Sequence, residues 1–344
     1  MKKGLCLCMA VLTLLMCALP VCGADVSRID EYKAAFVKMD GPEVDGLTVD
    51  FAAFSPEVKD GQKYPVVLYF HGMGQGAEPG SQIADNNFPL WASEELQARF
   101  HNGGAYLLAF RTHEEKKEYW DDKYIAAVKA AADAFIESHR DSVDLTRIYA
   151  GGFSMGGKMT LKMITSYPGF FAAAFPMCPA YRPSEAQYKA VANMPIWLIT
   201  SKYDVIAGYH STGKDVWDNI CRFSACPGDC RLTLFGKVCY PDGKKTPSNH
   251  HVWFSVSNDL FTYDGGAYPN AVTTSAAGEE ITLTYPNGII AWLNQYTSDY
   301  DGTNDGFTNL AKDNPEKTTD LVWGILKSLV LAFFDTVKAV LKIG

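Results

Sequence analysis

Ser154 stands at the centre of Gly152-Phe153-Ser154-Met155-Gly156, the stretch of this chain whose residue types point most directly to chemistry. A β-type run, 147–150, precedes it, and a run with helical spacing, 155–166, follows it. At a sharp turn from strand to helix, small neighbours let a serine adopt a strained backbone, with its hydroxyl exposed and the helix N-terminus directed at it. The sequence therefore predicts a nucleophile elbow that transfers acyl groups through Ser154.

Asp204 is the predicted acid partner of this serine. A serine hydroxyl is a weak nucleophile, so it needs a histidine to accept its proton and an acid to orient that histidine. The predicted strand 194–200 runs into the loop that carries Asp204, at the carboxyl edge of a parallel sheet, where ligands bind in open α/β folds. Asp215 and Asp218 are weaker candidates because they fall in a predicted helix, and a turn-capping role is the structural alternative for Asp204.

The predicted base comes after the acid along the chain. The adjacent histidines His250 and His251 lie beyond Asp204 and beyond the last predicted strand, 231–235. We predict that His250 is the general base, with His251 as the alternative. Neither has a carboxylate or a cysteine at metal-ligand spacing beside it, so no metal and no organic cofactor is predicted.

Backbone amides are predicted to stabilise the negative oxygen of a tetrahedral intermediate. His71-Gly72-Met73-Gly74 directly follows the predicted strand 65–70, so we expect the Met73 amide to lie opposite the Met155 amide, behind the nucleophile. These two amides form the predicted oxyanion hole, and an ordinary glycine turn is the alternative for the first of them.

The elements that position these residues alternate between strand-like and helical runs from 64 to 238, which is typical of a parallel sheet with helices on both faces. The predicted parallel strands are 65–70, 105–110, 147–150, 171–177, 194–200 and 231–235. A helix is predicted over 124–138, and an antiparallel edge hairpin around 47–51. Farther on, a strand over 281–285 and a closing helix over 288–296 are expected. The predicted fold class is α/β.

The order of these blocks resembles the α/β-hydrolase superfamily. More narrowly, residues 51–296 resemble its exported group of polyhydroxybutyrate depolymerase-like, feruloyl and acetylxylan esterase-like and predicted peptidase proteins. The blocks that carry the resemblance are 64–74, 144–157, 196–204 and the His-x-x-Trp that begins at His250. The resemblance implies Ser154 as nucleophile, Asp204 as acid, His250 as base, and the Met73 and Met155 amides as oxyanion donors. Ser201-Lys202 departs from the His-Gly usual before the acid loop.

The N-terminus predicts export. Met1-Lys2-Lys3, an apolar run over 5–21 and Cys22-Gly23-Ala24 together indicate a signal peptide over 1–24, with cleavage near Ala24-Asp25. A lipoprotein anchored at Cys22 is the weaker interpretation, because Val21 is not a small residue. The formal net charge of −8 and the lack of a basic run argue against nucleic acid or anionic membranes as partners.

Four clustered cysteines interrupt the block between acid and base, in a predicted insertion over about 219–241. They are Cys221, Cys226, Cys230 and Cys239. In an oxidising compartment this cluster predicts two disulfides of undetermined pairing, and a four-cysteine zinc site is the rival interpretation. Cys178 has no evident partner, so we expect it to be a buried core thiol.

The chain is predicted to continue beyond a catalytic domain of residues 25–297. Residues 298–318 are polar and predict a solvated linker, although Asp299, Asp301 and Asp305 loosely resemble a calcium loop. Residues 319–344 predict an amphipathic helix with too short a charge-free run to cross a bilayer. We expect this helix to dock on the protein itself, with a membrane surface or self-association as the alternative.

Taken together, these features predict a secreted or periplasmic serine hydrolase that cleaves carboxylic esters through an acyl-enzyme on Ser154. The candidate substrates are acyl groups on polysaccharides, polyesters and short acylated metabolites, and the sequence does not select among them. A serine peptidase of the same fold is the nearest rival, and an exported binding module without turnover is the rival of a different class.

Overall fold

The computed structural model describes residues 23–116, 119–240, 243–259, 262–263, 266–267, 271–283 and 287–310. The predicted amphipathic helix over 319–344 lies outside these residues, and so does the predicted signal peptide apart from Gly23 and Ala24. No helix within the described ranges is both long enough and apolar enough to cross a membrane.

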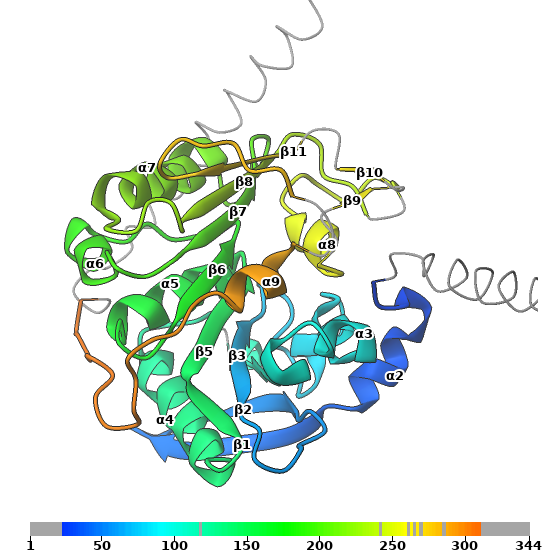
Figure 1. The fold of residues 1–344 in the computed structure, drawn as a ribbon, viewed down its shortest axis with the longest axis vertical. Helices are drawn as coiled ribbons and strands as arrows, with labels where there is room; N and C mark the ends of the chain where they lie inside the picture. The colour runs from blue at the N-terminus through cyan, green and yellow to red at the C-terminus, as the bar shows by residue number, and fades with distance from the viewer. Residues whose placement is uncertain are drawn as a thin grey trace, which may run out of the picture.

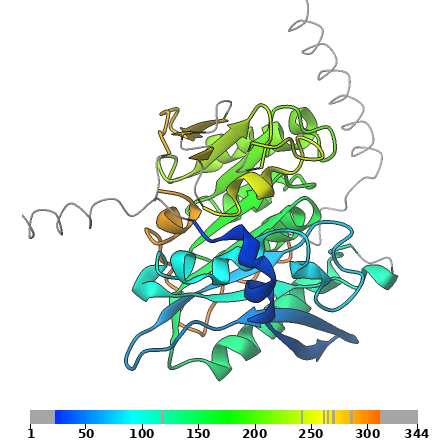
Figure 2. The same ribbon diagram turned by 90° about the vertical axis from the view of Figure 1, so that its right-hand side faces the viewer.

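A nine-stranded sheet runs through the described part of the chain in the order β1-β2-β4-β3-β5-β6-β7-β8-β11. Its strands are β1 (Val37–Val44), β2 (Leu47–Phe54), β3 (Tyr64–Phe70), β4 (Tyr106–Phe110), β5 (Val143–Phe153), β6 (Ala173–Met177), β7 (Trp197–Ser201), β8 (Arg231–Phe235) and β11 (Ala271–Ser275). The strands from β4 to β8 are parallel, whereas β1, β2 and β11 pair antiparallel at the two ends of the sheet. Figures 1 and 2 show the β1–β2 hairpin (blue) at one end and β8 with β11 at the other. The prediction of a mostly parallel sheet is confirmed, and β9 (Thr262–Tyr263) with β10 (Gly266–Ala267) forms a separate small sheet.

Helices cover both faces of this sheet, as predicted (Figure 1). The α-helices are α2 (Ile29–Ala34), α3 (Glu94–Gln97), α4 (Lys123–Ser138), α5 (Met155–Ser166), α6 (Glu185–Ala190), α7 (Lys214–Phe223), α8 (Val252–Val256) and α9 (Ile289–Leu293). Short turns of other helix types are η1 (Val26–Arg28), η2 (Ser81–Ile83), η3 (Phe88–Ala92), η4 (His101–Gly103), η5 (Glu114–Lys116) and η6 (Tyr209–Gly213). Val66 and Leu68 of β3 join the core under α4 and α5, whereas Val67 and Tyr69 join the core under α3 and α9. Alternate residues of one strand thus fill two hydrophobic layers, which explains its continuous apolar run.

The predicted strand over 281–285 is wrong over its described part, 281–283, and its last two residues lie outside the described residues. The edge strand is β11, which pairs with β8 in the register Ala271↔Phe235 to Ser275↔Arg231. The chain then turns at Gly278, whose φ is +90°, and residues 281–283 return outside any strand, with the Ile281 N–H donating to the Thr273 carbonyl at 2.8 Å. Residues 281–285 alternate in polarity along the sequence, whereas Ala271–Ser275 does not, so the sequence pattern pointed away from β11.

The predicted polar linker lies against the protein over its described part, 298–310. The Gly169 N–H donates to the Asp305 carbonyl at 2.9 Å, and the Thr308 N–H donates to the Ser166 carbonyl at 2.7 Å. The Asp305 carboxylate pairs at 2.8 Å with Lys129, a buried lysine of α4. These contacts hold the segment on the face of the sheet that α4 and α5 cover.

The predicted disulfides are absent, because all five cysteines among the described residues are free thiols. Cys230 precedes β8 and Cys239 follows it, so five residues of extended strand, about 16 Å, separate them. Cys226 shares the Ser224 hydroxyl with Cys230, at sulfur–oxygen distances of 3.6 and 3.3 Å, whereas Cys221 is exposed on α7. Closeness in sequence does not bring these four sulfurs into two bonded pairs.

Asp259 anchors the closing helix α9 to the body. Its fully buried carboxylate accepts hydrogen bonds from the Ile289 and Ile290 N–H groups at the start of α9, the latter at 3.2 Å. Arg99 lies 3.7 Å away. Burial outweighs these favourable contacts and raises the pKa of Asp259 from 3.8 to about 7.

We expect Asp259 to make stability fall as pH rises. Because its folded-state pKa lies above its ordinary value, the folded protein holds a proton that the unfolded chain gives up between about pH 4 and pH 7. The stability gained from this proton is complete below about pH 4 and is lost as pH rises through about 7. Urea unfolding midpoints between pH 4 and pH 8 should therefore fall less steeply for Asp259→Asn than for the wild type. Asp30→Asn, at a 91% exposed carboxylate, is the matched control, and equal slopes for Asp259→Asn and the wild type would contradict the expectation.

Candidate functional site

Ser154 joins β5 to α5 in a strained turn. Its φ of 56° and ψ of −118° lie in a region that non-glycine residues rarely adopt. The surrounding backbone holds it there. The Ser154 N–H donates to the Met177 carbonyl at 2.9 Å, and its own carbonyl accepts from the Lys158 and Ala180 N–H groups at 3.0 and 3.1 Å. The predicted strand–serine–helix turn is present, and α5 begins at the predicted residue, Met155.

The glycines around Ser154 are required by close backbone contact. A Cβ on Gly152 would lie 2.5 Å from the Phe70 carbonyl oxygen, and a Cβ on Gly156 would overlap the same oxygen. The turn between β5 and α5 thus presses directly on the end of β3. Phe70 is also the register partner of Gly152 in the parallel pair of these strands.

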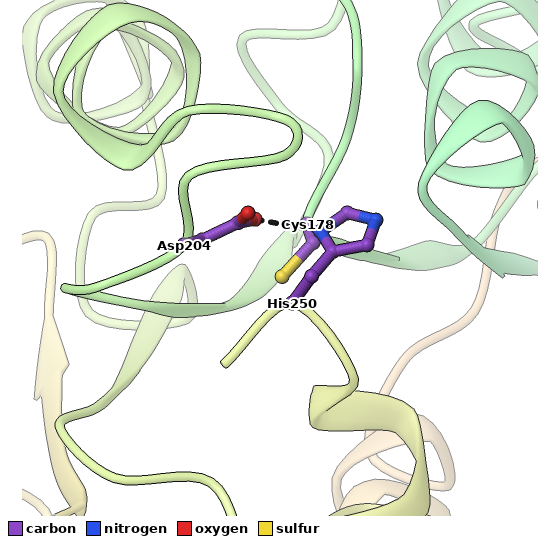
Figure 3. Close-up of side chains that lie close together, drawn as sticks. All are labelled: Cys178, Asp204 and His250. Carbon is purple, nitrogen blue, oxygen red and sulfur yellow. Dashed lines mark hydrogen bonds and ion pairs between the residues drawn. The ribbon is translucent and has the colours of Figure 1, made fainter. Parts of the chain in front are cut away.

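Asp204 and His250 meet at the same edge of the sheet (Figure 3). Asp204 lies in the loop after β7, and His250 lies between β8 and α8. Their hydrogen bond, from His250 Nδ1 to Asp204 Oδ2, measures 2.8 Å, and both side chains are at least 95% buried. Because Nδ1 carries the proton of this bond, Nε2 of a neutral His250 is left as an acceptor.

Asp204 is held as a carboxylate. Although burial opposes the charge, the hydrogen bond and charge of His250 and the backbone N–H of Ile206 lower the pKa of Asp204 below its usual value. The Ile206 and Ala207 N–H groups donate to Oδ1 at 2.8 and 3.1 Å, which leaves Oδ2 for His250. The loop geometry therefore orients the carboxylate toward the imidazole.

His251, the alternative base, faces elsewhere. Its Nδ1 lies 2.8 Å from the Ser248 hydroxyl, and its ring stacks on Phe254. The weaker acid candidates are also separate, because Asp215 and Asp218 lie on α7 and Asp218 pairs with Lys214 at 2.5 Å. Among the predicted acids and bases, only Asp204 and His250 are brought together.

Cys178 is a neighbour of this pair that the sequence did not reveal. Its sulfur, a carboxylate oxygen of Asp204 and a ring nitrogen of His250 lie within 4.8 Å of one another (Figure 3). This set offers sulfur, oxygen and nitrogen ligands, but burial raises the pKa of the Cys178 thiol well above its ordinary value, so the thiolate that a metal needs is disfavoured. One feature of the sequence could have revealed this position. Cys178 directly follows the predicted strand 171–177, so it lies at the carboxyl edge of the sheet.

The predicted oxyanion residues flank Ser154. Met155 is the first residue of α5, and Met73 lies in the loop that leaves β3, the strand beside β5. Gly72 fits against the Phe153 ring, where a Cβ would lie 2.5 Å from a ring carbon, so this loop passes close to the elbow. Met73 as a whole is 61% exposed.

Comparisons with known proteins agree with this fold. The family described as "Putative esterase" matches residues 47–220, about half of the chain. A comparison with curated proteins found no match to the chain. A solved thermostable esterase is similar with a TM-score of 0.58 at 20% identity, over 77% of this chain and 64% of that one. This chain therefore spans less than two thirds of that esterase, and the likeness supports the fold alone.

Two acylaminoacyl peptidase structures are more distant. One, in complex with Z-Gly-Gly-Phe-chloromethyl ketone, has 16% identity and a TM-score of 0.46, over 68% of this chain and 42% of that one. The other, from Pyrococcus horikoshii, has 16% identity and a TM-score of 0.43, over 59% of this chain and 37% of that one. Neither structure is similar enough to support a conclusion about this chain. The family match confirms the predicted resemblance at the level of the superfamily. With its mostly parallel sheet and its match over residues 47–220, the chain belongs to the "Putative esterase" family of the α/β-hydrolase superfamily.

Proposed function

We propose that this protein is a serine hydrolase that cleaves carboxylic esters through an acyl-enzyme on Ser154. The observation that carries the proposal is the buried hydrogen bond between Asp204 and His250, formed at the sheet edge where the strained turn presents Ser154. Membership of an esterase family supports an ester, rather than an amide, as the bond that is cleaved. Acyl groups on polysaccharides, polyesters and short acylated metabolites are the candidate substrate classes.

In this mechanism, His250 Nε2 accepts the proton of the Ser154 hydroxyl as its oxygen attacks the ester carbonyl carbon. The carbonyl oxygen becomes an oxyanion and accepts hydrogen bonds from the Met73 and Met155 amides. When the intermediate collapses, the carbon–oxygen bond to the alcohol breaks and His250 returns the proton to the leaving oxygen. Water then attacks the acyl-enzyme by the same proton path, which releases the acid and restores Ser154.

Asp204 contributes by orientation and charge. It fixes the His250 tautomer with the proton on Nδ1 and stabilises the imidazolium that forms during each step. The lowered pKa of Asp204 keeps its carboxylate ionised at neutral pH. Because both partners are at least 95% buried, little water competes for this bond.

Ser154→Ala tests the nucleophile. We expect kcat on p-nitrophenyl acetate to fall by about 10⁴ to 10⁶-fold, because the covalent step is lost. A fluorophosphonate probe should add to the wild type on the peptide that contains Ser154, as read by mass spectrometry, and should not label the variant. Ser138→Ala, at an exposed serine of α4, is the control and should behave as the wild type. Unchanged ester hydrolysis by Ser154→Ala would refute the proposal.

Asp204→Asn tests the acid separately. The amide keeps the size of the side chain but no longer fixes the productive tautomer of His250, so we expect kcat to fall by about 10⁴-fold. Asp218→Asn makes the same change on the surface of α7 and should keep wild-type kcat. Comparable kcat values for the two variants would show that Asp204 does not serve His250 in catalysis.

We further propose that the protein is exported and that the mature chain begins at Ala24. The Ala24 N–H donates to Asn258 Oδ1 at 2.7 Å, and Asn258 Nδ2 donates to the Ala24 carbonyl at 2.9 Å. Ala24 is also buried. Cleavage after Ala24 would remove both hydrogen bonds, whereas cleavage after Gly23, also a small residue, keeps them and turns the amide into an ammonium donor.

N-terminal sequencing of the exported protein measures this directly. We expect the sequence Ala-Asp-Val-Ser, beginning at Ala24. A first residue of Asp25 would show that the contacts of Ala24 do not persist in the mature protein, and an uncut N-terminus would contradict export by a cleaved signal peptide.

A further inference from the structure

The loop that leaves β3 depends on a second segment for its shape. We name residues 71–76 the oxyanion loop, since it carries Met73, and residues 111–116, which follow β4, the clamp segment. The oxyanion loop contains three glycines and no helix or strand, so its own backbone does little to restrict it. Several of its backbone groups are instead bound by side chains of the clamp segment.

Glu114 provides the central contact. Both of its carboxylate oxygens accept the Gly74 N–H at 2.9 Å, and Oε2 also accepts the Gly76 N–H at 2.9 Å. Gly74 has a φ of +88°, a conformation that favours glycine, so the bond fixes a turn directly after Met73. Hydrogen bonds from backbone N–H groups to a carboxylate are stronger than neutral ones.

Arg111 holds the far end of the oxyanion loop. Its Nη1 donates to the Gly76 carbonyl at 2.8 Å, while its Nε and Nη2 bind the buried carboxylate of Asp50 at 2.7 to 3.0 Å. A guanidinium fixed by two bonds to one carboxylate has little freedom. This end of the loop is therefore attached to β2 and to the start of the clamp segment.

His71 holds the near end. Its Nε2 accepts the Thr112 N–H at 3.1 Å, its Nδ1 donates to the Gly72 carbonyl at 2.6 Å, and its own carbonyl accepts from the Trp120 indole at 3.0 Å. Burial lowers the pKa of His71 to about 4, so the ring stays neutral at physiological pH and can accept at Nε2. The two ends of the loop are thus held by buried groups. Between them, Glu114 binds the Gly74 and Gly76 N–H groups, and the Ser81 hydroxyl donates to the Gln75 carbonyl at 3.0 Å.

We propose that Glu114 is a positioning residue for the oxyanion hole, because it holds Gly74 and Gly76 so that the preceding Met73 amide faces the reacting carbonyl. This inference rests on the proposed function, and Glu114 acts through the backbone without contact to the substrate. Loss of one oxyanion donor costs about 10² to 10³-fold in kcat, and displacement by about 1 Å can cost 10²-fold. Loosening the loop should therefore lower kcat by about tenfold to 10²-fold.

The test compares Glu114→Ala and Glu114→Gln with the wild-type enzyme on p-nitrophenyl acetate. We expect kcat to fall by the stated factor in Glu114→Ala, with KM changed less than about twofold, because the oxyanion forms only in the transition state. Glu114→Gln should lie between the two. Its carbonyl oxygen, in the place of Oε2, can still accept the Gly74 and Gly76 N–H groups, but it carries no charge, and its amide nitrogen cannot replace Oε1 as the second acceptor for Gly74. Glu137→Ala, at an exposed glutamate of α4 paired with Arg140, is the control and should keep wild-type kcat.

A second measurement separates positioning from a general loss of structure. A trifluoromethyl ketone forms a tetrahedral adduct with the serine. We expect Glu114→Ala to bind this inhibitor more weakly, by about the same factor as its fall in kcat, whereas the KM of Glu114→Ala for the ester stays near the wild-type value. Wild-type kcat together with wild-type affinity for the trifluoromethyl ketone in Glu114→Ala would overturn the inference. So would a fall in kcat that comes with a comparable rise in KM and a lower melting temperature, because that pattern indicates a general loss of structure. Failure of the proposed function is distinct, because the wild-type protein itself would then hydrolyse no ester and take no fluorophosphonate label on Ser154.

Discussion

The close contact between the end of β3 and the turn from β5 to α5 determines the geometry of the site. The Phe70 carbonyl leaves no room for a Cβ on Gly152 or Gly156, so the two backbones can approach only through glycine. This approach places Ser154 in its positive-φ turn, and the residue after Phe70, His71, begins the oxyanion loop. One contact therefore sets the distance between Ser154, the proposed nucleophile, and the oxyanion loop. A larger residue at either glycine would push these two backbones apart.

Buried polar groups surround this contact on both sides. On one side, His250 donates a single hydrogen bond to Asp204, and both side chains are buried. On the other side, Arg111 and Asp50 form a buried ion pair that carries no proton transfer but fixes the far end of the oxyanion loop. Burying charge is costly, so such pairs are weak evidence for stability. Their positions around one sheet edge fit the roles proposed above, in which Asp204 orients His250 and Arg111 fixes the oxyanion loop.

The cysteines illustrate how a local pattern can mislead. Cys226, Cys230 and Cys239 are close in sequence, yet β8 carries the last of them to the opposite end of a strand from the second. Cys178, which lacked a partner in the sequence, is instead the thiol that lies beside Asp204 and His250. A strand converts sequence distance into spatial distance at about 3.3 Å per residue, whereas a parallel sheet brings distant strand ends together.

The sequence by itself determined the elements whose signals are local. The apolar runs of β3 to β8, the spacing in α4 and the glycines around Ser154 depend on neighbouring residues, and they predicted the sheet, its helices and the elbow. It also predicted Asp204, because a loop after a parallel strand must reach the carboxyl edge. Tertiary structure alone decided the rest: that His250 and not His251 meets Asp204, that β11 pairs with β8, and that Glu114 binds Gly74, 40 residues away. Those outcomes depend on contacts between segments far apart in the chain. His250 and His251, for example, are adjacent residues of the same type, and only the fold decides which of them faces Asp204.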